Sequence, residues 1–410
     1  MNKLVIGISL LLVGLTQGCK HEVAQWRGTD RNGIYQETGL LDQWPDNGPG
    51  LLWTFEGIGR GFAAPVVSVD KIFVNGELDG ISYLFAFDLA GNLLWKSPNG
   101  DEFLGEGFSS SYPGARSTPT VLGNLVYTSS GTGRIACFDT DDGTEKWAVS
   151  IVDDLGGFVT EFGYSESLAV DRKKVYCFPG GKENNMVALD RFSGRTIWSS
   201  ELLQDTFAYG SPVMVELPDR EILITTSRHH LFTVDLKEGA LLGSYPIEGY
   251  EIDGEHCNTP VYSDGYIYFV GNDELGQGAV RLELSSDGES ISEVWRNSEI
   301  RNNFGGLVTV DHHLFTTVKG NRLLSLDPET GTLADSIKLA TGSLVYADNK
   351  FICYGNNGTV SLVRYDQDKL EMTGKLKVSE GTGHHFSHPV LDNGIMYIRH
   401  GNALMAYQIK

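Results

Sequence analysis

The sequence predicts an all-β protein, an eight-bladed β-propeller made of four-stranded antiparallel blades. Glycine supplies 50 of the 410 residues and aromatic residues 10 %, which is typical of chains with many turns and short strands. A pattern of four short apolar segments separated by turn residues recurs about every 46 residues, the period of a propeller blade. The last copy lacks one strand, and a matching segment precedes the first copy.

Each copy begins with a small or hydroxyl residue, then Pro or Leu, then an apolar pair. An apolar strand, an apolar-x-apolar-Asp run, a glycine turn and usually a tryptophan follow. The Pro or Leu positions are Pro65, Pro119, Leu168, Pro212, Pro260, Leu307, Leu344 and Pro389. Closing such sheets into a ring lets each pack on two neighbours and removes free edges. Because the seventh copy is weak, the competing count is seven blades with an insertion.

The eighth copy ends at Lys410, after its third strand. Residues 50–54, Gly-Leu-Leu-Trp-Thr, carry the missing tryptophan strand. The sequence therefore predicts a propeller over residues 50–410 whose last blade is closed by an N-terminal strand.

The recurring Asp-x-x-x-Gly and the tryptophan have structural explanations. The aspartate accepts turn N–H bonds, the glycine adopts the positive φ of the hairpin, and the tryptophan packs between sheets. In the fourth copy Leu242 replaces the tryptophan. Residues 139–145 are acidic but too short for a calcium loop, so a turn is predicted there.

The N-terminus predicts export. Residues 1–18 contain Lys3 and an apolar stretch too short to span a bilayer, as in a lipoprotein signal peptide. Gly18-Cys19 predicts cleavage and lipidation of Cys19, and Lys20 favours sorting to the outer membrane over retention in the inner membrane. The sequence leaves open whether the protein lies on the periplasmic face or on the cell-surface face of that membrane. The alternative is an ordinary signal peptide with an incidental cysteine. Residues 19–49 do not repeat and predict a lipidated, ordered arm on the ring.

The net charge of the chain excludes some classes of binding partner. The net charge of −21 argues against nucleic acid, which is bound through basic residues. It also argues against docking of the polypeptide surface on anionic lipid, so the membrane contact is the lipid anchor. The remaining cysteines have no metal-ligand spacing and predict buried free thiols: Cys137, Cys177, Cys257 and Cys353.

One group of polar residues is suited to binding or catalysis. Equivalent positions of the inner strands converge at the mouths of a propeller channel, so polar residues two to four positions before the Pro or Leu predict a ring at one mouth. These residues are Arg116, Glu166, Tyr209, His256, Asn258, Asn303 and His385, with His388 directly before Pro389. Such a ring would bind a sugar or a carboxylate, with Arg116 neutralising an anion. Glu166 and His256 are the catalytic candidates, as an acid–base pair. The alternative is a hydrated funnel of mutually satisfied hydrogen bonds.

A metal site is not predicted. His384, His385 and His388 suggest one, but strand alternation sends neighbouring side chains to opposite faces.

The run at residues 187–198, Val-Ala-Leu-Asp-x-x-Ser-Gly-x-x-x-Trp, resembles the pyrroloquinoline-quinone-type (PQQ-like) propeller repeat. The resemblance covers residues 50–410 and extends to residues 26–33, 112–120 and 177–182. This family is often named after quinoprotein alcohol dehydrogenases or after the outer-membrane assembly lipoprotein BamB. The dehydrogenases are longer, have adjacent cysteines over the quinone and bind calcium beside it. This chain has no Cys-Cys pair and no haem-attachment CxxCH, so neither PQQ nor calcium is assigned.

The function predicted from these features is a lipid-anchored, exported scaffold for binding or assembly of protein partners at the bacterial outer membrane, without a catalytic group. The alternative is an exported enzyme or ligand-binding protein that uses the channel mouth for a carbohydrate or an alcohol. A PQQ-dependent dehydrogenase is the third interpretation.

Overall fold

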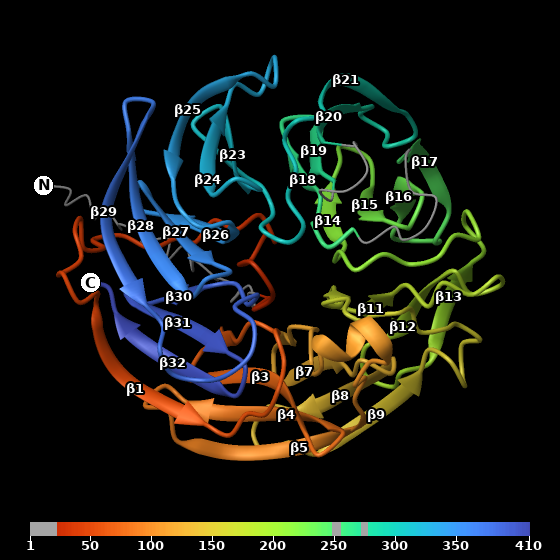
Figure 1. Ribbon diagram of the computed structural model, residues 1–410. Coiled ribbons are helices and arrows are strands. Elements are labelled where there is room, and N and C mark those ends of the chain that lie inside the picture. The colour runs from red at the N-terminus through yellow and green to blue at the C-terminus, as the bar shows by residue number, and fades with distance from the viewer. Residues whose placement is uncertain (1–22, 248–255, 272–277) are drawn as a thin grey trace, which may run out of the picture.

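The computed structural model describes residues 23–247, 256–271 and 278–410. Over these residues, 32 strands form eight four-stranded antiparallel sheets. The sheets are arranged radially around a centre (Figure 1), which confirms the predicted all-β, eight-bladed propeller. A single 3-10 turn, η1 (Gly107–Ser111), is the only helical element in the described ranges, and no helix there could span a bilayer.

Blades I to IV each run from an inner to an outer strand in chain order. Blade I comprises β2 (Val66–Ser68), β3 (Lys71–Leu78), β4 (Ile81–Asp88) and β5 (Leu93–Asp101). Blade II comprises β6 (Thr120–Leu122), β7 (Leu125–Ser129), β8 (Arg134–Asp139) and β9 (Glu145–Ser150). Blade III comprises β10 (Ala169–Val170), β11 (Lys174–Cys177), β12 (Met186–Asp190) and β13 (Thr196–Ser200). Blade IV comprises β14 (Val213–Glu216), β15 (Glu221–Thr226), β16 (His230–Asp235) and β17 (Leu241–Pro246).

Blades V to VII repeat this order. Blade V comprises β18 (Val261–Ser263), β19 (Tyr266–Val270), β20 (Ala279–Leu284) and β21 (Ile291–Asn297). Blade VI comprises β22 (Val308–Val310), β23 (His313–Val318), β24 (Arg322–Leu326) and β25 (Leu333–Lys338). Blade VII comprises β26 (Gly342–Ala347), β27 (Lys350–Gly355), β28 (Thr359–Asp366) and β29 (Lys369–Lys377). The weak seventh repeat is therefore a complete blade, and the alternative count of seven is wrong.

Blade VIII closes the ring with strands from both ends of the chain. It comprises β30 (Val390–Asp392), β31 (Ile395–His400), β32 (Ala403–Gln408) and, outermost, β1 (Gly50–Glu56). β1 pairs antiparallel with β32, and Trp53 lies opposite Ala406. The predicted closure by an N-terminal strand is confirmed.

Burial follows the position of a strand in its blade. Every residue of β27 is buried, because neighbouring blades cover both faces of the middle strands. No residue of the outer strand β13 is fully buried. Cys137, Cys177 and Cys353 are buried free thiols as predicted, whereas Cys257 is partly exposed.

Tryptophans lock adjacent blades together. The indole of the outer strand covers the glycine in the turn between the third and fourth strands of the next blade. Five seams are built in this way: Trp53 on Gly91, Trp95 on Gly143, Trp147 on Gly194, Trp198 on Gly239 and Trp295 on Gly331. Each indole Nε1 also donates to a backbone carbonyl of that next blade. The predicted packing of tryptophan between sheets is thus observed.

Blade IV lacks this tryptophan, but not where the sequence pattern suggested. Gly243 pairs with Thr233 in the register that Trp198 has with Ala188, so Gly243, and not Leu242, occupies the tryptophan position. The repeat aspartate stands seven residues before this position in blade I, but eight residues before it in blade III and in blade IV, which accounts for the difference of one residue.

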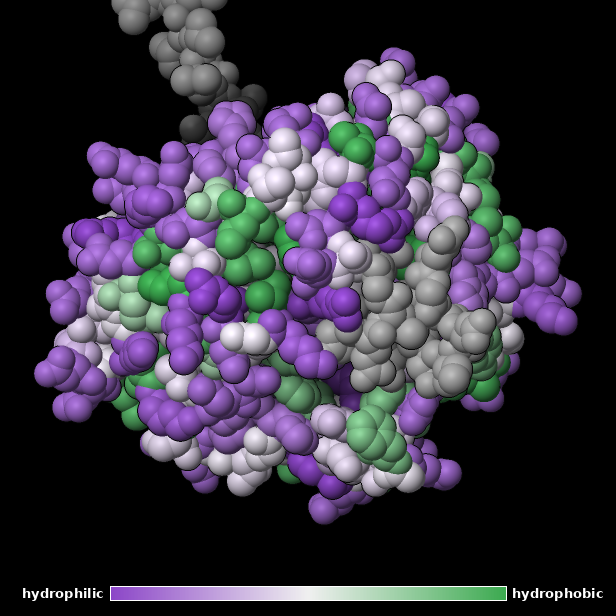
Figure 2. All heavy atoms as spheres, turned by 45° about the horizontal axis from the view of Figure 1, so that its top comes forward, coloured by the Kyte–Doolittle hydropathy of each residue, from purple (hydrophilic) through white to green (hydrophobic). Residues whose placement is uncertain are grey.

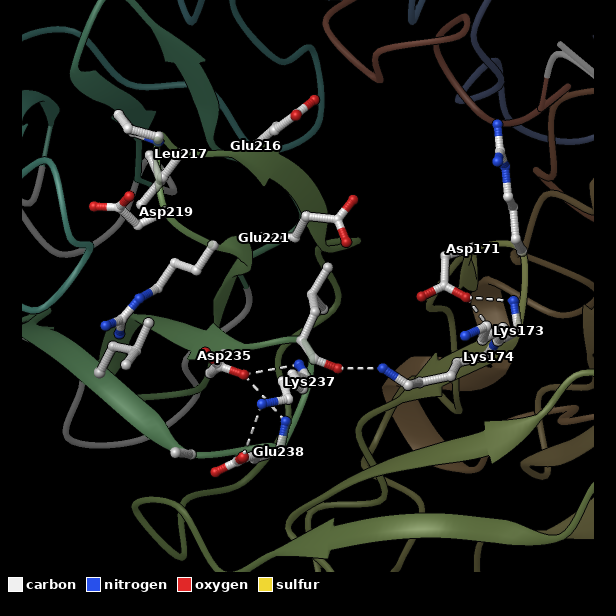
Figure 3. A pocket seen from close by; sticks show the side chains of 16 residues that line it. Asp171, Lys173, Lys174, Glu216, Leu217, Asp219, Glu221, Asp235, Lys237 and Glu238 are labelled. Atoms are coloured by element: carbon white, nitrogen blue, oxygen red, sulfur yellow. Dashed lines mark hydrogen bonds and ion pairs between the residues drawn. The ribbon is translucent and has the colours of Figure 1, made fainter. Parts of the chain in front are cut away.

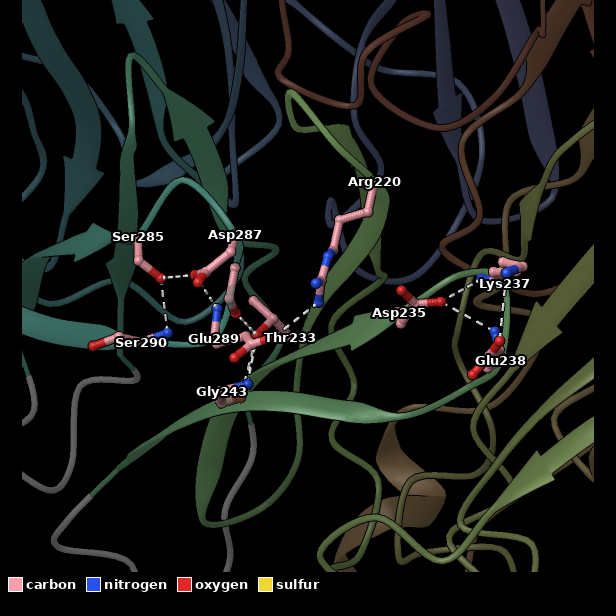
Figure 4. Close-up of polar contacts among 11 residues, drawn as sticks. Arg220, Thr233, Asp235, Lys237, Glu238, Gly243, Ser285, Asp287, Glu289 and Ser290 are labelled. Carbon is pink, nitrogen blue, oxygen red and sulfur yellow. Dashed lines mark hydrogen bonds and ion pairs between the residues drawn. The ribbon is translucent and has the colours of Figure 1, made fainter.

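Polar contacts close the seam between blades IV and V instead. The Thr233 hydroxyl donates to the Gly288 carbonyl at 2.8 Å, and Arg220 pairs with Glu289 at 3.2 Å. Figure 4 shows these contacts between the two blades.

In blade VII the tryptophan position is Gly374, and Trp44 of the N-terminal arm packs on it.

The aspartates of the repeat make turns. Asp190 Oδ1 accepts the amides of Phe192 and Ser193 at 3.1 and 2.9 Å, and Gly194 has φ +69°. Asp139 accepts the Asp141 amide in the same way. The prediction of a turn at residues 139–145 is confirmed.

Candidate functional site

The N-terminal arm, residues 23–49, enters the centre of the ring. Ala24 pairs with Val121 of β6, and Ile34 with Tyr346 of β26. The red segment of Figure 1 accordingly reaches the middle of the propeller. The arm arrives from the side of the turns that join the first and second strands, which we call the arm face. The opposite end of the channel, where each chain segment enters its inner strand, is called the mouth.

Arg31 of the arm is buried on the axis and binds the inner strands. Its Nη1 donates to the carbonyls of Ser167 and Pro212 at 2.6 and 3.0 Å, and its Nη2 donates to the Leu168 carbonyl at 2.5 Å. One guanidinium therefore joins blades III and IV. Arg27 Nη2 binds the Leu307 carbonyl at the start of blade VI in the same way.

At the mouth, each chain segment that enters an inner strand carries a residue three positions before the repeat Pro or Leu. We call these residues the mouth ring: Phe62, Arg116, Ser165, Tyr209, Cys257, Phe304, Thr341 and Phe386. Members from different blades touch one another. Ring centroids of Phe62 and Phe386 are 5.4 Å apart, and those of Phe304 and Phe386 are 4.7 Å apart. Arg116 lies with its Cζ 5.4 Å from the Phe62 ring.

A second aromatic layer covers the mouth ring. His384 stacks on Phe386 with centroids 5.1 Å apart, and Tyr112 stacks on His384 at 4.9 Å. Phe108, on η1, packs edge-on against Tyr112 and Phe162 and is 67 % exposed. On the side of the molecule drawn in Figure 2, hydrophobic residues likewise form patches between polar ones.

Of the predicted site residues, the structure places Arg116 and Tyr209 in the mouth ring. Burial lowers the pKa of Arg116, and Glu102 and Tyr209 oppose that shift electrostatically. Glu166 and Asn258 stand two positions before the Leu or Pro, while His256, Asn303 and His385 stand four before.

Asn258 has a structural role between blades. Its Nδ2 donates to the carbonyls of Val270 and Asn302 at 3.0 and 2.6 Å, and its Oδ1 accepts the Gly306 amide at 2.9 Å. It therefore bridges blades V and VI. Asn303 is exposed at the mouth.

Glu166 is buried with partners in its own blade. It accepts hydrogen bonds from the Tyr164 hydroxyl and from the Phe178 amide, the latter at 3.0 Å. Burial raises its pKa to about 7, although these bonds and the charge of Arg31 act in the opposite direction. Burial raises the pKa of Glu102 in the same direction.

His256 packs against blade IV. Its Nε2 lies 3.2 Å from the Arg228 carbonyl oxygen, and its ring meets Phe269 edge-on at 5.6 Å. Burial lowers its pKa to about 4, so the imidazole is neutral at pH 7. Glu166 and His256 therefore have separate hydrogen-bond partners in blades III and IV, and their action as an acid–base pair stays a prediction.

The histidines before β30 diverge. The Tyr354 hydroxyl lies 2.6 Å from His385 Nδ1, and His385 stacks on His400 with centroids 3.7 Å apart. His388 is buried and packs edge-on against Trp26 at 5.1 Å. Burial lowers the pKa of His385 to about 4 and that of His388 to about 3. Both are neutral at pH 7.

A hollow of about 1070 Å³ lies away from the mouth, between blades III and IV on the arm face. Figure 3 shows Glu216, Asp219 and Glu221 on one side and Lys173 and Lys174 on the other. It is a seam between surface turns with charges of both signs, and it contains none of the predicted site residues.

Sequence reasoning missed the aromatic character of the mouth. Phe62, Tyr209, Phe304 and Phe386 recur at the same distance before the Pro or Leu in four of the eight repeats. That periodicity was available as a signal. The axial role of Arg27 and Arg31 depends on contacts across the ring and has no comparable signal.

A comparison with protein families gives a match over more than half of the chain. The profile of the family described as outer membrane protein assembly factor BamB matches residues 80–334. This chain belongs to that family. A search of curated proteins gave no similar sequence.

Solved structures share the fold at low identity. BamB from Moraxella catarrhalis superposes with a TM-score of 0.62 at 13 % identity, over 88 % of this chain and 97 % of that one. The quinohemoprotein alcohol dehydrogenase ADHIIG from Pseudomonas putida HK5 gives 0.63 at 13 %, over 93 % and 79 %. A europium-containing methanol dehydrogenase gives 0.67 at 11 %, over 93 % and 90 %. At such identities the likeness shows the fold alone.

A quinone–metal site does not fit the described residues. Within them, no three His, Cys, Asp or Glu side chains are grouped as ligands for a metal ion. The mouth ring contains no carboxylate, the ligand such a metal would need; besides aromatic faces and one guanidinium it offers hydroxyl groups and one thiol. No step through such a group is derived.

Proposed function

We propose that this protein is an exported, lipid-anchored scaffold of the outer membrane whose mouth face binds a protein partner. The observation that carries the proposal is the aromatic mouth: side chains from the connections between several blades meet there, and Phe108 is 67 % exposed. The lipid anchor rests on Cys19, which lies outside the described residues.

Aromatic surface favours a protein partner. Phe, Tyr and Arg are enriched in protein interfaces, and they concentrate binding energy in few residues. Large apolar side chains left exposed together mark interaction sites. The family name, an assembly factor of the outer membrane, points the same way. The arm fills the centre of the ring from the other face, which favours docking at the mouth over passage through it.

Site-specific photocrosslinking tests the proposal in intact cells. A photoreactive phenylalanine analogue replaces Phe108 at the mouth or, as a matched control, Phe192, which is 60 % exposed on a turn of the arm face. We expect one discrete protein adduct from position 108 and none of that mass from position 192. The same adduct from both positions, or none from position 108, would contradict docking at the mouth.

Binding of a carbohydrate or an alcohol at the mouth is the second candidate function. Arg116 supports it, because its guanidinium is partly buried beside the Phe62 ring and could meet a polar ligand between aromatic faces. A thermal-shift screen with the full chain tests it. A ligand whose stabilising effect is lost in Arg116→Ala and kept in the exposed Arg172→Ala supports this function; an effect equal in both variants opposes it.

A further inference from the structure

The N-terminal arm shows that the inner edges of the blades can pair with an extended chain. In blade II the Val121 N–H donates to the Ala24 carbonyl at 2.7 Å, and the Ala24 N–H donates to the Val121 carbonyl at 3.0 Å. In blade VII the backbone of Tyr346 bonds to Gly33 and Tyr35 in the same manner. Val121 and Tyr346 both stand two positions after the repeat Pro or Leu.

Blade V has the same inner edge, and its equivalent residue is Tyr262 of β18. Tyr262 pairs with Ile267 one step before the turn of the hairpin, which is the register of Val121 with Val126 in β6 and β7. Antiparallel pairs alternate between those that exchange hydrogen bonds and those that do not, so Tyr262 directs its N–H and C=O toward the channel, as Val121 does. Among the described residues, the arm makes no backbone bond to Tyr262.

Blade IV offers a longer edge of this kind. The Leu217 N–H donates to the Arg220 carbonyl at 2.8 Å and closes the hairpin of β14 and β15. From that pair, the alternation along the ladder directs the N–H and C=O of Glu216 and of Met214 toward the channel. Because β14 is the innermost strand of its sheet, no neighbouring strand of the blade pairs with these groups.

A hollow of about 340 Å³ lies against both edges, and we call it the axial hollow. It is lined by all four residues of β14, by residues 260–262 at the start of blade V and by residues 30–32 of the arm. Met214 and Tyr262 are partly exposed and Glu216 is exposed. The two strand edges are therefore accessible to an incoming chain.

The lining of the axial hollow favours a cation. Its carboxylates are Asp30 and Glu216, and neither has an ion pair or a hydrogen bond among the described residues. The one cation of the lining, Arg31, is buried and donates to backbone carbonyls. The ring of Tyr262 adds an aromatic face on which a cation can lie. The net charge of −21 on the whole chain also attracts a basic partner.

We propose that the axial hollow docks an extended peptide segment of a partner protein that carries a lysine or an arginine, added as a strand to the channel edge of β14. The segment would exchange backbone hydrogen bonds with Met214 and Glu216, as the arm does with blades II and VII. Its basic side chain would lie near the carboxylates of Asp30 and Glu216 and the ring of Tyr262. This site is on the arm face and is separate from the docking proposed at the mouth.

Isothermal titration calorimetry with the full chain and three capped peptides tests the chemistry of the site. The first peptide alternates valine and lysine, the second has the same sequence with every backbone nitrogen methylated, and the third has glutamate in place of lysine. We expect the first to bind, the second to bind about tenfold more weakly or worse because its backbone donors are lost, and the third not to bind. No binding of the first peptide, or equal binding of the first and second, would overturn the proposal.

Two pairs of variants test the location. Asp30→Asn should weaken binding of the valine–lysine peptide about threefold. Its control, Asp219→Asn, removes an exposed carboxylate in the turn after β14 but outside the axial hollow, and should bind like the wild type. Met214→Pro removes the N–H that faces the channel and should weaken binding, whereas Met214→Ala keeps that N–H and should not. Equal affinities for Asp30→Asn and Asp219→Asn would overturn the proposal even if the proline variant does not fold.

Discussion

Replacing Gly194 with alanine tests whether the tryptophan contacts lock the blades. A Cβ at this position would lie 2.7 Å from Trp147 Cε3 and 2.9 Å from Cδ2. The indole cannot withdraw freely, because its Nε1 donates to the Arg191 carbonyl at 2.9 Å. The seam between blades II and III must therefore widen, or the indole must leave its rotamer and lose that bond.

The expected loss in the free energy of unfolding has two parts. Gly194 has φ +69°, and alanine in the left-handed region costs about 1–2 kcal/mol. Overpacking against a fixed ring adds about 1–3 kcal/mol. We expect Gly194→Ala to lower the free energy of unfolding by about 2–5 kcal/mol. Gly156→Ala is the matched control, since Gly156 has φ +65° and nothing within 4 Å of its added Cβ; it should cost only the first part.

Urea unfolding followed by tryptophan fluorescence and far-UV circular dichroism measures both variants. The double variant Gly194→Ala with Trp147→Leu should be more stable than the sum of the single losses predicts, because the smaller side chain leaves room for the methyl group. Equal losses for Gly194→Ala and Gly156→Ala would refute the argument, since the backbone term alone would then explain both.

Two further predictions concern the axis. Glu166→Gln should change how stability depends on pH: the wild-type carboxyl has its pKa raised from 4.5 to about 7, so its contribution is fully present below pH 4.5 and is lost as pH rises through 7. This loss of stability is about 3 kcal/mol at most. Urea unfolding at pH 5 and pH 8 should show it for the wild type and not for Glu166→Gln. The same change of stability with pH in both proteins would contradict this role of Glu166. Arg31→Met should lower the free energy of unfolding by about 3–5 kcal/mol, because buried carbonyls of blades III and IV lose their donor. The exposed Arg172→Met should stay within about 0.5 kcal/mol of the wild type, and a similar loss in both would contradict the role of Arg31.

The blade pattern was predictable because it is local and repeated. Each blade needs the same alternation and the same turn residues, so one period read along the chain is enough to place eight sheets. The last repeat lacks its fourth strand, and this predicted that residues 50–54 close the ring. The pairing of Trp53 with Ala406 confirms it.

The mouth was predictable only to within a window of residues. Adjacent positions in an extended segment face opposite ways, so an uncertainty of one residue exchanges the channel side for the side between blades. Arg116 and Tyr209 stand three before the Pro and belong to the mouth ring, whereas Glu166 and Asn258 stand two before and are buried among polar partners. The choice of Leu242 over Gly243 for the tryptophan position of blade IV was an error of the same size, because the spacing from the repeat aspartate differs by one residue between blades.

The arm was predictable only as an ordered, non-repeating segment. Arg27 and Arg31 have φ +62° and +55°, a conformation that non-glycine residues rarely adopt without support from the surrounding fold. That support comes from carbonyls of blades III, IV and VI, more than a hundred residues away in sequence. A local pattern contains no information about such contacts.

The position of the arm has a consequence for orientation at the membrane. Ala24 pairs antiparallel with Val121, so Val23 lies toward the turn after β6, on the arm face. Four residues span at most about 14 Å, so lipidation of Cys19, as proposed, would hold the arm face against the bilayer. The mouth ring would then point away from the membrane, toward soluble partners. With the lipidated protein in vesicles that contain nitroxide-labelled lipids, a fluorophore at Phe192 should be quenched more than one at Phe108. Stronger quenching at Phe108 would show that the mouth faces the bilayer, and would separate the aromatic surface from the docking role proposed for it.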